Sequence, residues 1–243
     1  MAYFLSQTKN RPEQSGFCSD VVEENGMALE RMNDFFAARL AGYDEHMLTE
    51  IEGARDFYPY TASLLPLKAG AKVLDLGCGT GLELEFYFQR NGEASVVGID
   101  LSKDMLKMLQ KKFADRRIDF INGSYFDIPL GEKCFDAAVS VESLHHYTDV
   151  QKLGLYTKLN KSLTAHGYFV LTDYFAESEA LETHYFSELE RQKKEEGLDP
   201  DVFYHYDTPL TVGHEMEVLR KSGFSDVQIM KNWGATYTLL ARR

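Results

Sequence analysis

The sequence is short of cysteine and has no long apolar run. Its three cysteines, Cys18, Cys78 and Cys134, lie far apart in a chain of 243 residues. An odd number at such spacing gives neither a metal-ligand motif nor a disulfide framework, which fits a reducing compartment. No apolar stretch approaches the roughly 18–20 residues that span a bilayer, and the first residues lack the pattern of a signal peptide. We therefore expect a cytoplasmic protein without a membrane partner.

Positive charge is also scarce. The chain has 26 Lys and Arg against 38 Asp and Glu, a formal net charge of −12. Nucleic-acid binding requires clustered Lys and Arg, and the one basic run, residues 110–117, is typical of a solvated helix end. A nucleic-acid partner is therefore not expected, although net charge alone does not exclude one. The apolar content of 44% and the aromatic content of 13% suffice for the core of an α/β domain.

The N-terminal quarter reads as helical. Residues 1–25 are polar, with interspersed Gly and Pro, as is typical of a mobile segment. After them, apolar residues recur at helical spacing, among them Met32 and Phe36. We predict that residues 1–65 form an N-terminal helical cap.

The rest of the chain alternates between short β runs and helical stretches. This texture begins after Gly70 and predicts that residues 66–243 form an α/β domain with a mostly parallel sheet. A final strand pair around Gly234 adds one antiparallel strand. Residues 175–212 are expected to be an insertion that extends the cap.

Three alternating glycines, Gly77, Gly79 and Gly81, follow the first predicted strand of this domain. A glycine-rich turn at a helix N-terminus leaves backbone N–H groups open to a phosphate, a carboxylate or a ribose. Asp100 ends the next predicted strand, 19 residues after Gly81, where a carboxylate commonly accepts the hydroxyls of a ribose. Since ligands bind beyond the carboxyl ends of parallel strands, we expect a nucleotide-like ligand there.

The glycine spacing argues against a dinucleotide. Dinucleotide-binding turns have their third glycine one residue later, where this chain has Leu82, and the strand before the turn carries Asp75. The combination of VLDLGCGTG and GIDLS resembles the class I S-adenosylmethionine-dependent methyltransferases. NGSYFDIPL is similar to the family's adenine loop, CFDAAVSVESLHHY to its fourth-strand motif, and LNKSLTAHGYFVLTD to the helix and strand that follow. The match covers about residues 70–175, and the last 30 residues fit the family's terminal strands.

The resemblance implies a Rossmann-like fold: a seven-stranded, mostly parallel sheet with one antiparallel strand, helices on both faces and an N-terminal helical cap. It implies S-adenosyl-L-methionine as the cofactor, S-adenosyl-L-homocysteine as the product, and no metal. Asp75 and the turn would hold the methionine end, and Asp100 the ribose. At Ser124 the chain departs from the family, which often has an acidic residue there. The expected cofactor-binding residues are Asp75, Gly77, Cys78, Gly79, Gly81, Asp100, Leu101, Met105, Gly123, Ser124, Tyr125 and Val141.

Catalytic residues are less constrained, because a sulfonium is already a strong methyl donor. By the resemblance, His145 and His146 lie close to the transferred methyl, and either is a candidate general base; alternatively, the pair only shapes its loop. No third ligand lies near them in sequence, so a metal site is not expected. Tyr43, on the predicted cap, is a further candidate for catalysis or for core packing. The substrate-binding candidates are Tyr43, His146, Tyr147, Tyr204 and Tyr206.

We predict a methyltransferase of class EC 2.1.1 that transfers a methyl group, by SN2 displacement, to an O, N, C or S atom of a small molecule. The acidic chain, the helical cap and the aromatic insertion favour this acceptor class. One alternative is a tRNA-modifying enzyme similar to those of the wobble-uridine pathway, some of which bind a carboxylated cofactor, or a protein methyltransferase. Another is a non-catalytic S-adenosylmethionine sensor. The sequence leaves the acceptor and the oligomeric state open.

Overall fold

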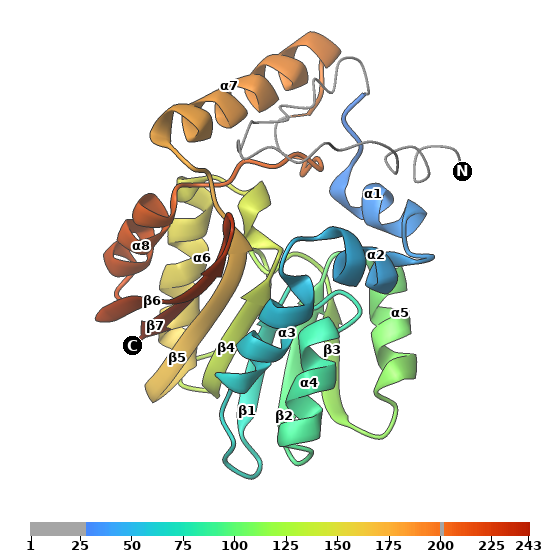
Figure 1. The fold of residues 1–243 in the computed structure, drawn as a ribbon, viewed down its shortest axis with the longest axis vertical. Coiled ribbons are helices and arrows are strands. Elements are labelled where there is room, and N and C mark those ends of the chain that lie inside the picture. The colour runs from blue at the N-terminus through green and yellow to red at the C-terminus, as the bar shows by residue number, and fades with distance from the viewer. Residues whose placement is uncertain (1–27, 200–201) are drawn as a thin grey trace, which may run out of the picture.

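The computed structural model describes residues 28–199 and 202–243, so the prediction for residues 1–25 lies outside it. Its centre is a seven-stranded sheet with the order β3-β2-β1-β4-β5-β7-β6 (Figure 1). The strands are β1 Lys72–Leu76, β2 Ser95–Asp100, β3 Arg117–Asn122, β4 Phe135–Val141, β5 Leu163–Tyr174, β6 Asp226–Trp233 and β7 Thr236–Arg242. β7 runs antiparallel to β5 and β6, whereas β1 to β5 pair in parallel. The predicted sheet, with its one antiparallel strand, is confirmed.

Helices cover both faces of this sheet. The helices are α1 Met32–Ala38, α2 Tyr43–Glu50, α3 Ala54–Ser63, α4 Leu82–Arg90, α5 Lys103–Lys112, α6 Asp149–Ser162, α7 Glu179–Glu196 and α8 Val212–Lys221, with a short 3₁₀ helix η1 at Leu144–His146. Side chains of α3, α4 and α5 form one apolar core with the sheet, and those of α6 and α8 form a second. No described helix is both long enough and apolar enough to cross a bilayer.

The cap lies beyond the carboxyl ends of the parallel strands. Figure 1 shows α1 and α2 above these ends, at the same end of the strands as α7. Extended residues after α7 return to the start of the cap: the amide of Met32 donates to the carbonyl of Phe203 at 3.0 Å, and that of His205 to Glu30 at 2.9 Å. Two segments far apart in the sequence therefore meet over the strand ends. The division into cap and domain stays a prediction.

Helix α7 is the main element that the sequence analysis did not identify. It has helical signals at its ends: the Ser178 hydroxyl accepts the amide of Leu181 at 3.2 Å, and Gly197 ends the helix with φ +64°. Leu189 is its one buried residue. Leu181, Tyr185 and Leu189 recur every four residues, a helical spacing that the sequence analysis did not use.

Candidate active site

The glycine turn joins the end of β1 to the start of α4. The amides of Gly77 and Cys78 both donate to the carbonyl of Ile99, at 2.9 and 3.2 Å. Gly77 and Gly81 have φ values of +73° and +75°, which only glycine adopts readily. A Cβ atom on Gly81 would also lie 2.8 Å from the ring of Phe113. The turn therefore presents bare backbone at the carboxyl ends of β1 and β2.

Asp100, the last residue of β2, faces this turn. Its carboxylate accepts the amide of Gly79 at 2.8 Å and that of Ser102 at 2.7 Å. Burial raises the pKa of Asp100, and the two amides oppose that rise. Each carboxylate oxygen keeps a further lone pair. The group is therefore held in place and can still accept hydroxyl groups of a ligand.

Asp100 lies in a cleft of about 60 Å³ at the strand ends. The predicted cofactor-binding residues in its wall are Gly77, Gly79, Asp100, Leu101, Met105, Tyr125 and Val141. Tyr43, His146 and Tyr147, which the sequence assigned to the acceptor side, line it as well. The cap residues Met32 and Phe36 close the cleft. Residues that are distant in the chain are thus brought together as the motif order predicts.

The other predicted cofactor-binding residues lie beside or beneath this cleft and are not among the described residues that line it. They are Asp75, Cys78, Gly81, Gly123 and Ser124. The Cys78 sulfur packs under β2, where a Cβ on Gly98 would approach it to 2.8 Å. The Ser124 hydroxyl accepts the amide of Phe126 at 3.1 Å, which closes a local turn. Whether these residues contact a cofactor stays a prediction.

Asp75 is paired with Glu83 of α4 beneath the turn. Both side chains are buried, and within the described chain Asp75 Oδ2 and Glu83 Oε1 have no hydrogen-bond partner. Burial raises the pKa of both groups, and the neighbouring Glu83 raises that of Asp75 further. Two buried carboxyl groups in contact share a proton rather than carry two charges. The ammonium of an amino-acid ligand can take the place of the shared proton, so the acidic pair suits the methionine end of the predicted cofactor.

A larger cavity of about 540 Å³ adjoins the cleft. Phe36, Tyr43, Glu142 and His146 line both spaces, so ligands in the two would meet at these residues. Aromatic and acidic side chains are prominent in the cavity wall: Phe35, Phe36, Tyr43, Tyr174, Trp233, Glu50, Glu52, Glu142 and Asp207. The cavity lies between the cap and the carboxyl ends of the strands.

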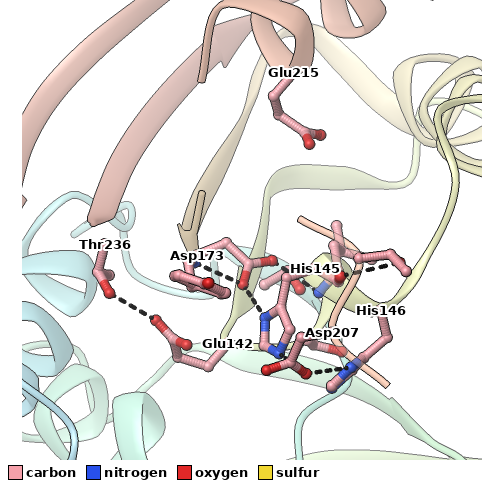
Figure 2. A network of polar contacts seen from close by, with 12 residues as sticks. Glu142, His145, His146, Asp173, Asp207, Glu215 and Thr236 are labelled. Carbon is pink, nitrogen blue, oxygen red and sulfur yellow. Dashed lines mark hydrogen bonds and ion pairs between the residues drawn. The ribbon is translucent and has the colours of Figure 1, made fainter. Parts of the chain in front are cut away.

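Glu142, directly after β4, stands at the junction of the two spaces. Its φ of +47° is rare for a residue other than glycine, and such strain concentrates at functional sites. The backbone is held by a 2.9 Å bond from its amide to Thr172, and the carboxyl accepts the Thr236 hydroxyl at 3.4 Å (Figure 2). Burial, and next Asp173, raise the pKa of Glu142 to about 8.

His145 is fixed by Asp173 at the end of β5 (Figure 2). Its Nδ1 lies 2.5 Å from Asp173 Oδ1, and its carbonyl accepts the amide of Thr208 at 2.8 Å. The ring therefore directs Nε2 toward Asp207, 3.6 Å away. Burial alone would lower the pKa of His145, but the carboxylates of Asp173 and Asp207 outweigh burial and raise it to about 9.

Asp207 joins the two histidines from the segment between α7 and α8. Its Oδ1 lies 3.1 Å from Nδ1 of His146, which is also 3.3 Å from the carbonyl oxygen of Tyr206. Burial lowers the pKa of His146, and the neighbouring His145 lowers it further. Within the described residues, the groups with metal-ligand spacing are His145–His146–Asp207 and Glu142–His145–Asp173. The sequence showed no third ligand for the histidines because Asp207 is remote in the chain.

The aromatic insertion contributes to the cavity through other residues than the two tyrosines selected from the sequence. His205 and Asp207 line the described cavity, and Tyr204 and Tyr206 do not. The ring of His205 stacks on Phe35, with centroids 3.4 Å apart and an angle of 7°. Successive side chains of an extended segment point to opposite sides, so choosing the tyrosines selected the other set. Their acceptor role stays a prediction.

Sequence reasoning also passed over Glu142, Asp173 and Asp207. The first two carried a signal, because Asp173 lies in the fifth predicted strand and Glu142 directly follows the fourth, as Asp100 ends the second. Asp207 carried none, since its neighbours in sequence do not show where its segment returns.

The comparisons with known proteins agree with the fold and the turn. A sequence profile of the methyltransferase domain matches residues 73–167. The fatty-acid O-methyltransferase of Mycolicibacterium smegmatis is 31% identical over 104 residues, 43% of this chain and 37% of that protein. The match thus spans little more than a third of this relative. A carboxy-S-adenosyl-L-methionine synthase of Nautilia profundicola is 25% identical over 186 residues, 70% of this chain and 76% of that protein.

Solved structures share the fold at low identity. A S-adenosylmethionine-dependent methyltransferase of Aquifex aeolicus matches with a TM-score of 0.59 and 16% identity, over 84% of this chain and 97% of that one. One from Mesorhizobium loti matches with a TM-score of 0.55 and 22% identity, over 76% and 96%. At such identities the likeness concerns the fold alone.

Proposed function

We propose that this chain, whose residues 73–167 match the methyltransferase domain, is a class I S-adenosylmethionine-dependent methyltransferase that binds S-adenosyl-L-methionine and methylates a small molecule. The observation that carries the proposal is the junction of two spaces. A cleft with a nucleoside-type carboxylate, Asp100, adjoins a 540 Å³ cavity at Tyr43, Glu142 and His146. A donor on one side and an acceptor on the other would meet there.

The cleft and the buried acidic pair beneath it both support the cofactor assignment. Asp100, held by two backbone amides, is placed to accept ribose hydroxyls. Asp75 has a buried oxygen without a donor, which suits an ammonium group. Leu101 and Met105 offer apolar contacts to a base, and a thioether packs well against a flat ring. Bound S-adenosyl-L-methionine supplies a methyl group on a positively charged sulfur.

The chain's own task is to exclude water and orient the acceptor. Phe36 and Tyr43, from the cap, lie between the cleft and the cavity and cover the junction. Holding two reactants in line at contact distance supplies much of the rate enhancement in such a transfer. His146 lines both spaces as Tyr43 does, which supports the proposal of these two residues as the catalytic candidates.

The cavity favours a small and not strongly anionic acceptor. Its volume falls in the range of about 300–1,000 Å³ that is usual for small-molecule sites. Arg39 in its wall is bonded to Glu30 at 3.0 and 3.2 Å, and carboxylates are prominent in the wall. Phosphate recognition requires clustered Lys and Arg. RNA is therefore a less favoured acceptor than a small molecule.

A second candidate function comes from a relative whose match with this chain covers about three quarters of its own length. The name of the Nautilia profundicola protein describes synthesis of a carboxylated S-adenosylmethionine, and the match covers 76% of it. A cation beside the added carboxylate would stabilise that product through a charge-assisted hydrogen bond. The one Arg in the described cavity wall, Arg39, is already paired with Glu30. Of the two candidate functions, methylation of an acceptor is therefore preferred to synthesis of a carboxylated cofactor.

Calorimetry tests the cofactor assignment. The wild type should bind S-adenosyl-L-methionine and its demethylated product, and NADH should not bind. Asp100→Asn should weaken binding roughly 5- to 150-fold, because leaving buried hydrogen-bonding groups unpaired costs about 1–3 kcal/mol. Asp104→Asn, at a partly exposed carboxylate paired with Lys107, should bind like the wild type. Unchanged affinity in Asp100→Asn would refute the assignment.

A labelled methyl group tests the acceptor class. The protein is incubated with S-adenosyl-L-methionine labelled in the methyl group and with separated small-molecule, RNA and protein fractions of a cell extract. Label in the small-molecule fraction supports the proposal, and label confined to RNA or protein overturns it. A carboxylated cofactor in the mass spectrum would select the second candidate instead.

A further inference from the structure

Three potential metal ligands converge in the wall of the larger cavity: His145 Nε2, His146 Nδ1 and Asp207 Oδ1 (Figure 2). The Asp207 oxygen lies 3.6 Å from the first nitrogen and 3.1 Å from the second. Ligands at about 2.0–2.2 Å from a tetrahedral ion lie about 3.4 Å from one another. The two separations bracket this value, and all three ligand atoms lie within 4.8 Å of one another, so side-chain movements can bring them to the distances that an ion needs.

Asp173 orients one of the three ligands, His145, as in known metal sites. A ligating imidazole usually donates its other N–H to a carboxylate, which fixes the ring and raises its basicity. Here Asp173 contacts Nδ1 of His145 at 2.5 Å, and Asp173 is itself held by the amides of Leu144 and Tyr174 at 2.8 and 3.0 Å. This leaves Nε2 of His145 toward Asp207. A 2.8 Å bond from the Thr208 amide to His145 ties the Asp207 segment to the same loop.

The ligand chemistry selects the ion. Two imidazole nitrogens with one carboxylate suit Zn²⁺ and its first-row neighbours, whereas Mg²⁺ and Ca²⁺ prefer oxygen ligands throughout. Three protein ligands leave a coordination position open, which is the pattern of catalytic rather than structural zinc. All three residues line the 540 Å³ cavity, and His146 also lines the cleft. An open position would therefore face the acceptor's space beside the junction.

We propose that His145, His146 and Asp207 bind a Zn²⁺ ion whose open position takes an oxygen atom of the methyl acceptor. The acceptor part rests on the proposed function, and the metal part does not. The ion would lower the pKa of the acceptor's hydroxyl and so favour loss of its proton to solvent before the transfer. The acceptor oxygen would then bond to the methyl carbon while the C–S bond breaks and leaves its electron pair on sulfur.

A proton is the competing occupant. A protonated His145 between Asp173 and Asp207 accounts for the same distances without an ion. The two arrangements differ in a measurable way, because a protonated imidazole has no lone pair for a metal. If the proton is the occupant, the protein takes up no Zn²⁺ at this place.

Metal titration of the full chain decides between them. The purified protein is stripped with a chelator and titrated with Zn²⁺, with Mg²⁺ as the comparison, in a calorimeter. We expect one Zn²⁺ per chain and no comparable Mg²⁺ binding. Asp173→Asn should weaken Zn²⁺ binding about 10- to 100-fold, and Asp207→Ala should weaken it further. His166→Gln, at an exposed histidine of β5, should leave it unchanged. Co²⁺ in place of Zn²⁺ should add visible absorption in the wild type and in His166→Gln, and not in Asp207→Ala.

Each outcome has one meaning. Failure to bind Zn²⁺, or Zn²⁺ binding that Asp207→Ala leaves intact, overturns the inference. Asp207 does not line the described cleft, so S-adenosyl-L-methionine binding should survive in Asp207→Ala and shows that the variant is folded; if it does not fold, Asp207→Asn takes its place. A wild type that binds the cofactor but no Zn²⁺ overturns this inference alone. One that binds Zn²⁺ but no cofactor overturns the proposed function alone.

Discussion

A Cβ atom on Gly77 would lie 2.7 Å from the Cβ of Ser143 and closer still to its hydroxyl oxygen. The two residues follow β1 and β4, neighbouring strands of the sheet. Their contact fixes the distance between the glycine turn and the loop that carries His145 and His146. Gly77 also has φ +73°. Both close packing and backbone conformation therefore require glycine there, and the two effects can be separated.

Gly77→Ala should lower the free energy of unfolding more than Gly70→Ala does. Gly70 has a similar φ of +67° but no atom within 4 Å of an added Cβ. Both substitutions place alanine in the left-handed region, at a cost of about 1–2 kcal/mol. Gly77→Ala adds overpacking, about 1–3 kcal/mol. Urea unfolding of the two variants measures the difference.

Removing the Ser143 side chain should restore part of that loss. In the double variant Gly77→Ala/Ser143→Gly the crowded atoms are gone and the backbone penalty remains. Its unfolding free energy should rise toward the value expected from the backbone penalty plus the cost of Ser143→Gly alone. Equal losses in Gly70→Ala and Gly77→Ala, or no recovery in the double variant, would show that packing against Ser143 does not fix the turn.

Lys152→Met should destabilise the protein by about 3–5 kcal/mol, because it leaves a buried charge without its partner. Lys152 Nζ lies 2.6 Å from Glu215 Oε2, with the two side chains 3% and 0% exposed. The Tyr156 hydroxyl bonds to the other oxygen of Glu215. Lys221→Met breaks a surface pair with Glu217 on the same helix as Glu215, both side chains 63% exposed, and should change stability by less than about 1 kcal/mol.

Thermal unfolding of both lysine variants checks this comparison. The double variant Lys152→Met/Glu215→Leu replaces both charges by apolar groups and should recover much of the loss. A Lys152→Met protein as stable as Lys221→Met would mean that water reaches Glu215 and solvates it.

Local patterns explain what the sequence predicted correctly. The turn at Gly77–Gly81 and the carboxylate of Asp100 lie at the ends of short apolar runs, and the carboxyl ends of parallel strands share one edge of the sheet. Placing each strand therefore placed its last residue. Strand β7 could be predicted from the local sequence as well, because Gly234 separates two β runs that pair directly.

Contacts made by distant segments explain the rest. Asp207 reaches His146 because the chain leaves the sheet, forms α7 and returns over the strand ends, and no local pattern encodes that return. Helix α7 shows helical spacing at Leu181, Tyr185 and Leu189, but only Leu189 is buried, so that pattern does not predict where the helix lies in the fold. The pairing of Asp75 with Glu83 depends on how α4 packs on β1, which the sequence does not specify.

Asp75→Asn should make the ligand-free protein more stable than the wild type at about pH 8. Burial, and next Glu83, raise the folded-state pKa of Asp75 well above its ordinary value, whereas the unfolded chain titrates near 3.9, roughly. Between these values the folded protein holds a proton that the unfolded chain has lost. The wild type therefore loses stability as the pH rises through the folded-state pKa, and the uncharged amide does not. The advantage of the variant in urea unfolding should vanish toward about pH 4, while Asp104→Asn should follow the wild type throughout.

The same substitution should weaken the binding of S-adenosyl-L-methionine, so stability and binding should move in opposite directions. Asp75 Oδ2 is buried without a donor, and an ammonium that approaches it gains a charged hydrogen bond worth about 1.5–3 kcal/mol. We therefore expect a loss of roughly 10- to 150-fold in calorimetry. Adenosine, which has no amino-acid group, should bind the variant and the wild type equally. Equal loss for both ligands would mean that the substitution distorts the turn, and no loss for either would mean that Asp75 only packs against Glu83. If Asp75 binds the ammonium of the cofactor, the variant should be more stable than the wild type and should lose affinity only for the ligand that carries the amino-acid group.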